Sequence, residues 1–270
     1  IPEIEAVTKT FDGTNETNLS SVKFYKENRN DKIEIDPSAY EITDVHFNDA
    51  NAGNDKSLFF TVTLKSNNYI LLTRSGELVR KETYECGRSG GYIIAKAAAP
   101  TLENADTSLK YADTTEQTAS VTGKMPANAG TLIYAKGTED LINYVDKWSV
   151  EEDGTVTYTI SGANAGTVIT LPVKISSTNY NDTTVNVIIT ITKATPTGEP
   201  AYDRISEKDK TLADTNLSDK DKDGKNKFSV EGTVKWADDD TTEVKQGEKY
   251  KWIFTPTDTA NYNTLTGEIT

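Results

Sequence analysis

Three aspartates at alternating positions, Asp219, Asp221 and Asp223, are followed by Gly224 in the segment DKDKDGKNKF. This is the spacing of the first half of a helix–loop–helix calcium loop, which places oxygen ligands at positions 1, 3 and 5 and glycine at position 6. The second half does not match, because position 12 holds Val230, which cannot coordinate an ion. Four interleaved lysines also weaken the attraction for a cation. We therefore favour a solvated hairpin loop, with a calcium site as the alternative.

Residues for nucleophilic or metal catalysis are scarce. The single histidine, His46, lies in the alternating segment EITDVHFND, and no phosphate loop is present. The single cysteine, Cys86, is followed two residues later by Arg88, whose charge could lower the thiol pKa. One cysteine and one histidine are too few for a Cys/His zinc site. We expect no enzymatic activity and no cofactor.

Aromatic side chains are the other candidates, because sugars stack on exposed rings. Trp236 and Trp252 share the parity of the apolar positions in their segments, so we expect both in the core. Trp148, in YVDKWSVEEDG, is placed less clearly and has Tyr144 four residues before it. Trp148 and Tyr144 are therefore the residues that we predict to contact a ligand if the chain binds glycan.

The charge balance excludes two classes of partner. The chain has 42 acidic and 29 basic residues, a formal net charge of −13. Nucleic acid and anionic membrane surfaces both require clustered basic residues, so neither is an expected partner. No apolar run reaches the roughly 18 residues of a membrane helix, which predicts no membrane insertion. The ends IPEIEAV and GEIT suggest a fragment of a longer protein.

The elements that must position these residues are strands. In KFSVEGTVKW the apolar residues Phe228, Val230, Val234 and Trp236 share one parity and polar residues take most of the other. KYKWIF, TVTYTI and VNVIITIT alternate in the same way. Such alternation is typical of strands with one buried face, as in antiparallel sheets. Helix is expected at most as a turn near residues 36–40 or 139–145.

Two short motifs recur along the chain. ANAG occupies residues 50–53, 127–130 and 163–166, and an Asn-Tyr pair follows a strand at Tyr69, Tyr180 and Tyr262. In Greek-key sandwiches a tyrosine at the corner before a closing strand bonds back to the backbone. We predict this structural role for the three tyrosines, with ligand contact as the alternative.

Two linkers divide the chain. Residues 95–102 (AKAAAPTL) and 192–200 (TKATPTGEP) are rich in alanine, proline and threonine, and proline there stiffens a joint. We predict three modules, residues 1–95, 96–193 and 194–270. The expected fold class is all-β: small antiparallel β-sandwiches, Ig-like in architecture, in an elongated tandem array.

The same segments carry a family resemblance. TKTFDGTNET resembles the opening of the YDG-type repeat, with Phe11 in the tyrosine place. ITKATPTGEP and FTPTDTANYNTLTGEIT resemble the joint and closing strands of bacterial Ig-like and MBG-type repeats, found in tandem on surface proteins of Gram-positive (Firmicutes-like) bacteria. The resemblance covers nearly the whole chain, although residues 73–92 depart from it as an inserted or lengthened hairpin. Some related repeats are β-grasp modules, which stay an alternative fold.

The resemblance implies an extracellular protein at the cell surface or attached to the cell wall. The function that we expect is that of a non-catalytic modular stalk or spacer in cell adhesion, acting as a monomer. One alternative is an adhesin module that binds host glycan or matrix protein. Another is an accessory region of a surface polysaccharide-degrading enzyme.

Overall fold

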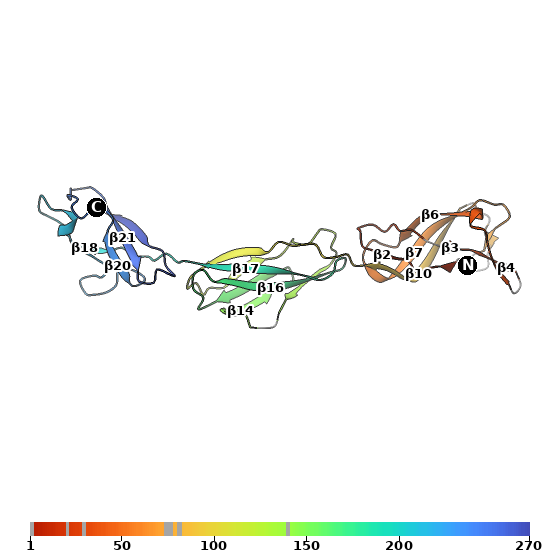
Figure 1. Cartoon of the computed structure of the whole chain (residues 1–270), viewed down its shortest axis with the longest axis horizontal. Coiled ribbons are helices and arrows are strands. Elements are labelled where there is room, and N and C mark those ends of the chain that lie inside the picture. Colours follow the sequence, from red (N-terminus) through yellow and green to blue (C-terminus); the bar gives the residue numbers. More distant parts are fainter. Residues whose placement is uncertain (1–2, 20–21, 29–30, 73–77, 80–82, 139–140) are drawn as a thin grey trace. The chain divides into compact units, whose positions relative to one another are not determined.

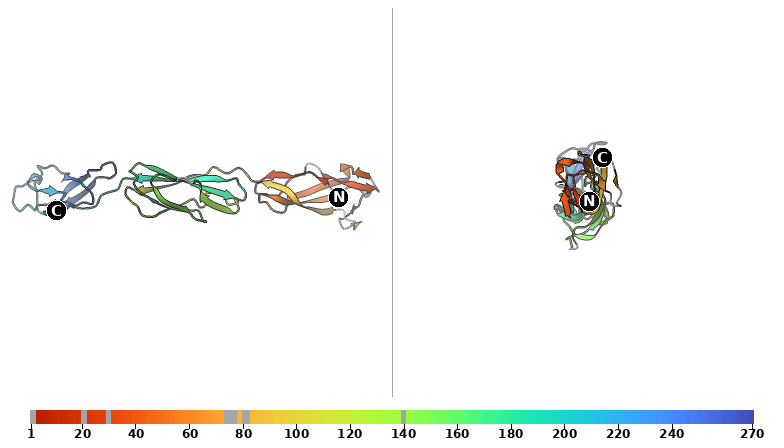
Figure 2. Two further views of the ribbon diagram at one scale, coloured as in Figure 1. Left: turned by 90° about the horizontal axis from the view of Figure 1, so that it is seen from below. Right: turned by 90° about the vertical axis from the view of Figure 1, so that its right-hand side faces the viewer.

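The chain folds entirely into strands and loops. The structure is a computed structural model that describes residues 3–19, 22–28, 31–72, 78–79, 83–138 and 141–270. Those residues form strands and two short 3₁₀ turns, Pro37–Ala39 and Leu212–Asp214, and contain no α-helix. Figures 1 and 2 accordingly show ribbons made of arrows. The predicted all-β class is confirmed, and the described residues lack the helix on which a β-grasp module depends. Nor do they contain a helix that is long and apolar enough to span a membrane.

Two compact units make up the chain, and they are interleaved in sequence. Unit 1 contains residues 1–103, 122–135 and 174–185, and unit 2 contains residues 104–121, 136–173 and 186–270. We call residues 1–95, 96–193 and 194–270 the first, second and third repeats. Each sheet takes all its strands from one repeat, while the three predicted domain boundaries themselves stay a prediction.

The first repeat lies in unit 1 and is built around one four-stranded sheet. Its order is β2 (Thr8–Thr10), β10 (Thr83–Ala95), β7 (Gly53–Leu64) and β6 (Tyr40–Phe47). Two-stranded pairs accompany it: β1 (Glu3–Ile4) with β3 (Val22–Lys23), β4 (Tyr25–Asn28) with β5 (Asp31–Glu34), and β8 (Leu71–Leu72) with β9 (Leu78–Val79). The pair β8–β9 begins the predicted lengthened hairpin, of which residues 73–77 and 80–82 lie outside the described residues.

The core of the first repeat follows the period of two. Along β7, Leu58, Phe60 and Val62 are buried while Phe59 between them is 39% exposed. Leu58 packs with Phe47 and neighbouring apolar side chains, and Phe60 and Val62 form a second cluster. Alternate side chains of a strand leave opposite faces, so a single strand contributes to the core with every second residue.

The second repeat has two sheets that share a core. One has the order β11 (Ala105–Lys110), β17 (Thr183–Thr192), β16 (Val168–Ser177), β13 (Leu132–Lys136), and the other β12 (Gln117–Ser120), β15 (Thr155–Ile160), β14 (Val145–Val150). Figure 1 shows β16 beside β17, with β14 in the other layer. Buried side chains alternate along the inner strands: Val156, Tyr158, Ile160, Leu171, Val173, Val187, Ile189 and Ile191. These are the parities that TVTYTI and VNVIITIT predict.

The third repeat, in unit 2, has a smaller core. Its sheet runs β20 (Gly232–Trp236), β21 (Tyr250–Pro256), β22 (Leu265–Ile269), and β18 (Ala201–Tyr202) pairs with β19 (Leu217–Ser218). Phe228 stacks on Phe254 with 3.9 Å between ring centroids, and Trp252 meets Phe228 edge-on. Trp252 is buried, as predicted, and Trp236 packs partly buried against the same cluster.

Two strand pairs depart from the antiparallel arrangement that the sequence predicts. Most pairs are antiparallel, but β2 pairs with β10 and β11 pairs with β17 in parallel. In each case the first strand of a sheet lies beside the last strand of the same repeat. Strands joined by an intervening crossover, and not by a tight hairpin, can run in the same direction.

Candidate functional site

The most elaborate polar site of unit 1 is where the linker after the first repeat meets the Asn-Tyr turn of the second. The Ala97 N–H donates to the Asn179 carbonyl (2.9 Å), and the Asn181 N–H donates to the Ala97 carbonyl (2.9 Å). The Lys96 ammonium donates to the Ser177 carbonyl (2.7 Å). Ala97 also forms a parallel bridge with Tyr180. The linker is therefore hydrogen-bonded as an extra, very short strand.

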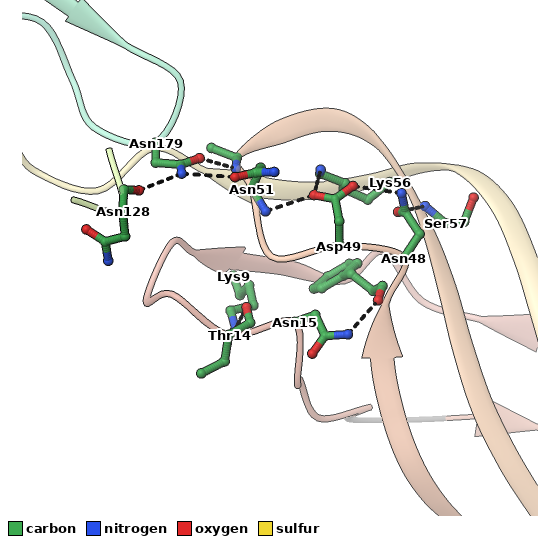
Figure 3. Close-up of polar contacts among 12 residues, drawn as sticks. Lys9, Thr14, Asn15, Asn48, Asp49, Asn51, Lys56, Ser57, Asn128 and Asn179 are labelled. Atoms are coloured by element: carbon green, nitrogen blue, oxygen red, sulfur yellow. Dashed lines mark hydrogen bonds and ion pairs between the residues drawn. The ribbon is translucent and has the colours of Figure 1, made fainter. Parts of the chain in front are cut away.

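The Asn179 side chain completes this junction (Figure 3). It is 2% exposed, and all three of its hydrogen bonds go to ANAG segments. Its Oδ1 accepts from the Ala52 N–H (2.9 Å), and its Nδ2 donates to Asn51 Oδ1 (3.1 Å) and to the Asn128 carbonyl (2.8 Å). Because a buried amide needs partners on both its oxygen and its nitrogen, these contacts fix which way the side chain faces.

An ion pair between Lys56 and Asp49 stabilises the turn that contains Asn51. Asp49 Oδ1 accepts from the Asn51 N–H (2.8 Å) and from the Lys56 ammonium (2.6 Å), whose side chain is 10% exposed. The hydrogen bond from Lys56 keeps the pKa of Asp49 below its ordinary value. Asn48 Nδ2 bonds the other carboxylate oxygen of Asp49 (2.8 Å). Figure 3 shows this network leading from Lys56 to Asn179.

Unit 2 contains a second junction with the same bonds. The Ala194 N–H donates to the Asn261 carbonyl (3.0 Å), and the Asn263 N–H donates to the Ala194 carbonyl (2.8 Å). The Lys193 ammonium donates to the Thr259 carbonyl (2.6 Å). Each bond has its counterpart in the first junction, at the same position relative to the Lys-Ala dipeptide and to the asparagine of the Asn-Tyr pair. The linker dipeptide and the Asn-Tyr turn therefore form a repeated pair.

The side chain of Asn261 repeats the role of Asn179. Its Oδ1 accepts from the Ala165 N–H (2.8 Å), and its Nδ2 donates to Asn164 Oδ1 (3.3 Å). Asn164 and Ala165 belong to the ANAG segment at residues 163–166, as Asn51 and Ala52 belong to that at 50–53. The third partner differs, because Asn261 Nδ2 also donates to Asp258 Oδ2 (2.8 Å). Three short motifs of the sequence, ANAG, Lys-Ala and Asn-Tyr, thus meet at each of two equivalent polar sites.

The Tyr180 hydroxyl does not form the predicted bond to the backbone, whereas the corner role of Tyr262 stays a prediction. The Tyr180 hydroxyl bonds the Asn128 side chain (3.1 Å) and not the backbone, and its ring meets Phe11 edge-on. The ring of Tyr262 meets Tyr111 in the same way, with 5.3 Å between centroids. Each tyrosine ring thus adds an aromatic contact beside its junction, Tyr180 with Phe11 and Tyr262 with Tyr111. For Tyr69, the corner role stays a prediction.

The junction asparagines were missed in the sequence reasoning, although both motifs were in view. The Asn-Tyr pair directed attention to the ring, which has the larger surface, and ANAG was interpreted as a turn signal. The available signal was that each linker also has the same dipeptide at its second and third positions, Lys96-Ala97 and Lys193-Ala194. Three motifs that recur in the same order predict a shared contact.

A groove in unit 2 contains one of the two predicted ligand residues. It has a volume of about 520 Å³, and its lining includes Glu116, Lys136, Leu141, Ile142 and Trp148. The Lys136 ammonium lies over the Trp148 ring, 4.8 Å from its centroid. Tyr144 is 47% exposed but does not line the groove. The structure therefore separates Trp148 from Tyr144, and a sugar that stacked on Trp148 would compete with Lys136 for one ring face.

The aspartate-rich loop is a self-contained turn. Asp221 Oδ1 accepts from the N–H groups of Asp223 (3.0 Å) and Lys225 (2.9 Å), which lowers the pKa of Asp221. The Lys227 N–H donates to the Asp219 carbonyl (2.8 Å), which closes the hairpin. Over the described ranges of the chain, no cluster of three acidic, histidine or cysteine side chains is placed to hold a metal. The geometry gives the calcium alternative no support.

The single cysteine and histidine show no reactive arrangement. Cys86 is half-buried on β10, and burial raises its thiol pKa more than Arg88 lowers it. Arg88 does lower the thiol pKa, as the sequence suggests, but the opposing effect of desolvation is larger. His46 stacks on Phe59, with 5.6 Å between ring centroids, and its Nδ1 lies 2.9 Å from the Asp44 carbonyl. Both residues pack in the first repeat as ordinary sheet side chains.

Comparisons with known proteins add little to this description. No family model matches the chain, and no curated protein matches it. Among solved structures, Drosophila N-cadherin EC1-3 is 10% identical, with 98% of this chain and 96% of that chain covered and a TM-score of 0.29. Mouse cadherin-23 EC22-24 is 10% identical, with 99% and 96% covered and a TM-score of 0.30. An endo-fucoidan hydrolase of glycoside hydrolase family 107 is 8% identical, with 99% and 43% covered and a TM-score of 0.28. Scores this low establish no shared topology.

Proposed function

We propose that this chain is a non-catalytic spacer of an extracellular surface protein and that its repeats carry tension along the polypeptide. The observation that supports this most directly is the pairing of the second repeat's first and last strands. Ala105–Lys110 of β11 pair in parallel with Val187–Thr192 of β17, residue by residue over the whole of β11. The Tyr111 N–H extends the ladder with a bond to the Thr192 carbonyl (2.8 Å).

Parallel pairing decides how tension acts on these hydrogen bonds. The chain enters the ladder at Ala105 and leaves it at Thr192, at opposite ends of the paired strands. A pull on both ends of the repeat slides β11 and β17 past each other, so the ladder bonds share the load and do not open one by one. Beneath them Leu109, Val187 and Ile189 are buried, which adds apolar contacts that must break together.

The first repeat has the same arrangement in a shorter form. Thr8–Thr10 of β2 pair in parallel with Ile93–Ala95 of β10. This ladder is half as long as that of the second repeat, so we expect the first repeat to yield at a lower force. In the third repeat, the linker contributes a single parallel bridge between Ala194 and Tyr262.

The location at a bacterial surface rests on the sequence resemblance. The opening segment around Phe11 and the joint and closing segments at residues 191–200 and 254–270 resemble surface-protein repeats of Gram-positive bacteria. In this proposal the chain is a monomer, attached to the cell wall through other regions of its protein, and its repeats follow one another in tandem. Its acidic surface would keep such an array soluble and apart from its neighbours.

Pulling a single molecule by its two ends tests the load-bearing proposal. Unfolding of residues 96–193 should release roughly 300 Å of chain in one event, since extended residues span about 3.3 Å each. We expect this event at the highest force of the three repeats. If the second repeat unfolds first, or gradually at low force, the proposal is wrong.

A pair of proline variants separates the ladder from general stability. Alternate N–H groups of a strand point to opposite edges. Because Tyr111 donates to β17, the N–H of Ala105 also points to β17, and that of Asp106 points away. Ala105→Pro therefore removes a ladder bond at the loaded end and should lower the unfolding force. Asp106→Pro is the matched control and should lower it less.

The groove beside Trp148 supports a second candidate, an adhesin module that binds glycan or matrix protein. Its lining combines an indole ring with charged groups on both sides, Glu116 and Lys136. A screen of the chain against mucins, plant polysaccharides and matrix proteins tests this candidate. A specific binder lost in Trp148→Ala and kept in Trp236→Phe would support it, and no binding at millimolar ligand would refute it.

A further inference from the structure

Each junction depends on an amide that uses both of its polar atoms. Asn179 accepts through Oδ1 from Ala52 and donates through Nδ2 to Asn51. Asn261 accepts from Ala165 and donates to Asn164. The same two adjacent groups, an alanine N–H and an asparagine Oδ1, are presented in both cases. The Asn-Ala dipeptide thus presents one donor and one acceptor, and its partner must both accept and donate a hydrogen bond.

We propose that the Asn-Tyr turn is a docking element specific for the Asn-Ala turn of a preceding repeat and for the Lys-Ala linker that follows that repeat, and that its asparagine determines this specificity. The partner is defined by its chemistry: one backbone N–H and one side-chain amide oxygen side by side, with a lysine and an extended alanine nearby. This goes beyond the load-bearing role, because it concerns which repeats can follow one another.

Asparagine suits this site better than its close relatives. Aspartate keeps the acceptor for Ala52 but has no donor for Asn51 Oδ1 or the Asn128 carbonyl, so oxygen would face oxygen. Glutamine adds a methylene at a position that is 2% exposed in Asn179, where added volume has no room. Alanine leaves the Ala52 N–H and the Asn128 carbonyl without their partner.

The remaining contacts explain why the site needs the right linker as well. The Lys96 ammonium reaches the Ser177 carbonyl, and Ala97 exchanges two backbone bonds with the turn. Lys193 and Ala194 do the same at Thr259 and Asn261. A linker without the lysine would leave one turn carbonyl unpaired. Docking therefore recognises two separate segments at once, the Asn-Ala turn of the preceding repeat and the linker that follows it.

Amide hydrogen exchange in the full chain tests the proposal, because each junction has its own reporter amide: Ala52 in the first and Ala165 in the second. Asn179→Ala should speed exchange of the Ala52 N–H about tenfold or more and leave that of Ala165 unchanged. Asn261→Ala should do the reverse. The proposal is overturned if Ala52 exchange is unchanged in Asn179→Ala. It is also overturned if either variant speeds both amides equally, since that would indicate general loss of stability.

The aspartate variant tests whether both sides of the amide matter. If the donor side contributes, Asn179→Asp should speed Ala52 exchange nearly as much as Asn179→Ala does. If the Ala52 N–H is as protected in Asn179→Asp as in the wild type, the acceptor oxygen alone is enough for docking, and the proposed specificity is wrong.

Trypsin provides an independent readout of docking. Cleavage after Lys96 should become at least several-fold faster in Asn179→Ala but not in Asn261→Ala, and cleavage after Lys193 should show the opposite. Equal cleavage in all variants would contradict the proposal. Exchange of the Ala52 N–H and cleavage after Lys96 do not involve the β11–β17 ladder, so failure of docking and failure of the load-bearing role are distinguishable.

Discussion

The ion pair between Lys56 and Asp49 supports the Asn51 turn, and replacing Lys56 by methionine tests how strongly. The two side chains meet at 2.6 Å, with Lys56 10% exposed and Asp49 40% exposed. Methionine keeps most of the apolar stem and removes the ammonium group. Asp49 then keeps its bonds from the Asn51 N–H and from Asn48 Nδ2 but loses its charged partner.

The expected cost lies between two limits. Breaking a fully buried pair costs about 3–5 kcal/mol, and an exposed pair contributes about 0–1 kcal/mol. Water reaches Asp49, so its carboxylate is partly rehydrated when Lys56 is removed. We therefore expect Lys56→Met to lower the free energy of unfolding of unit 1 by about 1–2 kcal/mol at pH 7.

The effect should depend on pH. The bond from Lys56 holds the folded-state pKa of Asp49 below its ordinary value of 3.8. A lowered folded-state pKa means that the pair contributes fully above the ordinary pKa and that its contribution is lost as the pH falls through the folded value. The stability difference between wild type and Lys56→Met should therefore shrink as the pH drops below about 4.

Urea unfolding followed by the amide NMR signals of Phe60 and Val62 measures this in unit 1. All three tryptophans lie in unit 2, so their fluorescence should be unaffected and serves as an internal reference. Lys65→Met is the matched control, because Lys65 and Glu41 form a half-exposed pair at 3.3 Å and should contribute little. An equal loss in both variants, or a loss in Lys56→Met that is the same at pH 3 and pH 7, would refute the reasoning.

Three further predictions concern single side chains. Trp236 has a buried Nε1–H that meets no acceptor in the described residues. Trp236→Phe should therefore leave the free energy of unfolding in urea unchanged or raise it by up to about 1 kcal/mol. A loss above about 2 kcal/mol would contradict this. A Cβ on Gly267 would lie 2.3 Å from Trp252 Cζ2, so Gly267→Ala should cost about 1–3 kcal/mol by calorimetry. Burial raises the pKa of Cys86, so iodoacetamide should alkylate it several-fold more slowly than free cysteine at pH 8.

Alternating strands were predictable because burial on one face leaves a period of two in the sequence. Val156, Tyr158 and Ile160 are buried as their parity requires, and so are Tyr250, Trp252 and Phe254. The parallel partners of β2 and β11 were not predictable in this way. Parity identifies the buried face of a strand but says nothing of which strand lies beside it.

The junctions show why site residues are harder to predict than strands. Asn179 and Asn261 are polar residues in turns, where the default expectation is a solvated side chain. They are buried only because distant segments, such as residues 50–53, supply donors and acceptors. Trp148, whose place the sequence left open, lines a groove, and its predicted contact with a ligand stays a prediction. Its presumed companion Tyr144 has a φ of 68° and does not line that groove.

The repeated junction also bears on how such proteins gain and lose repeats. Lys96 and Ala97 follow the first repeat in sequence but are hydrogen-bonded into the turn of the second. If recombination occurs just before Lys96, each exchanged repeat carries the Lys-Ala linker that its own Asn-Tyr turn binds. The repeat before it must still supply an Asn-Ala turn. Because that turn is chemically the same in the first and second repeats, gene duplication could exchange or multiply them without any compensating change at the joints.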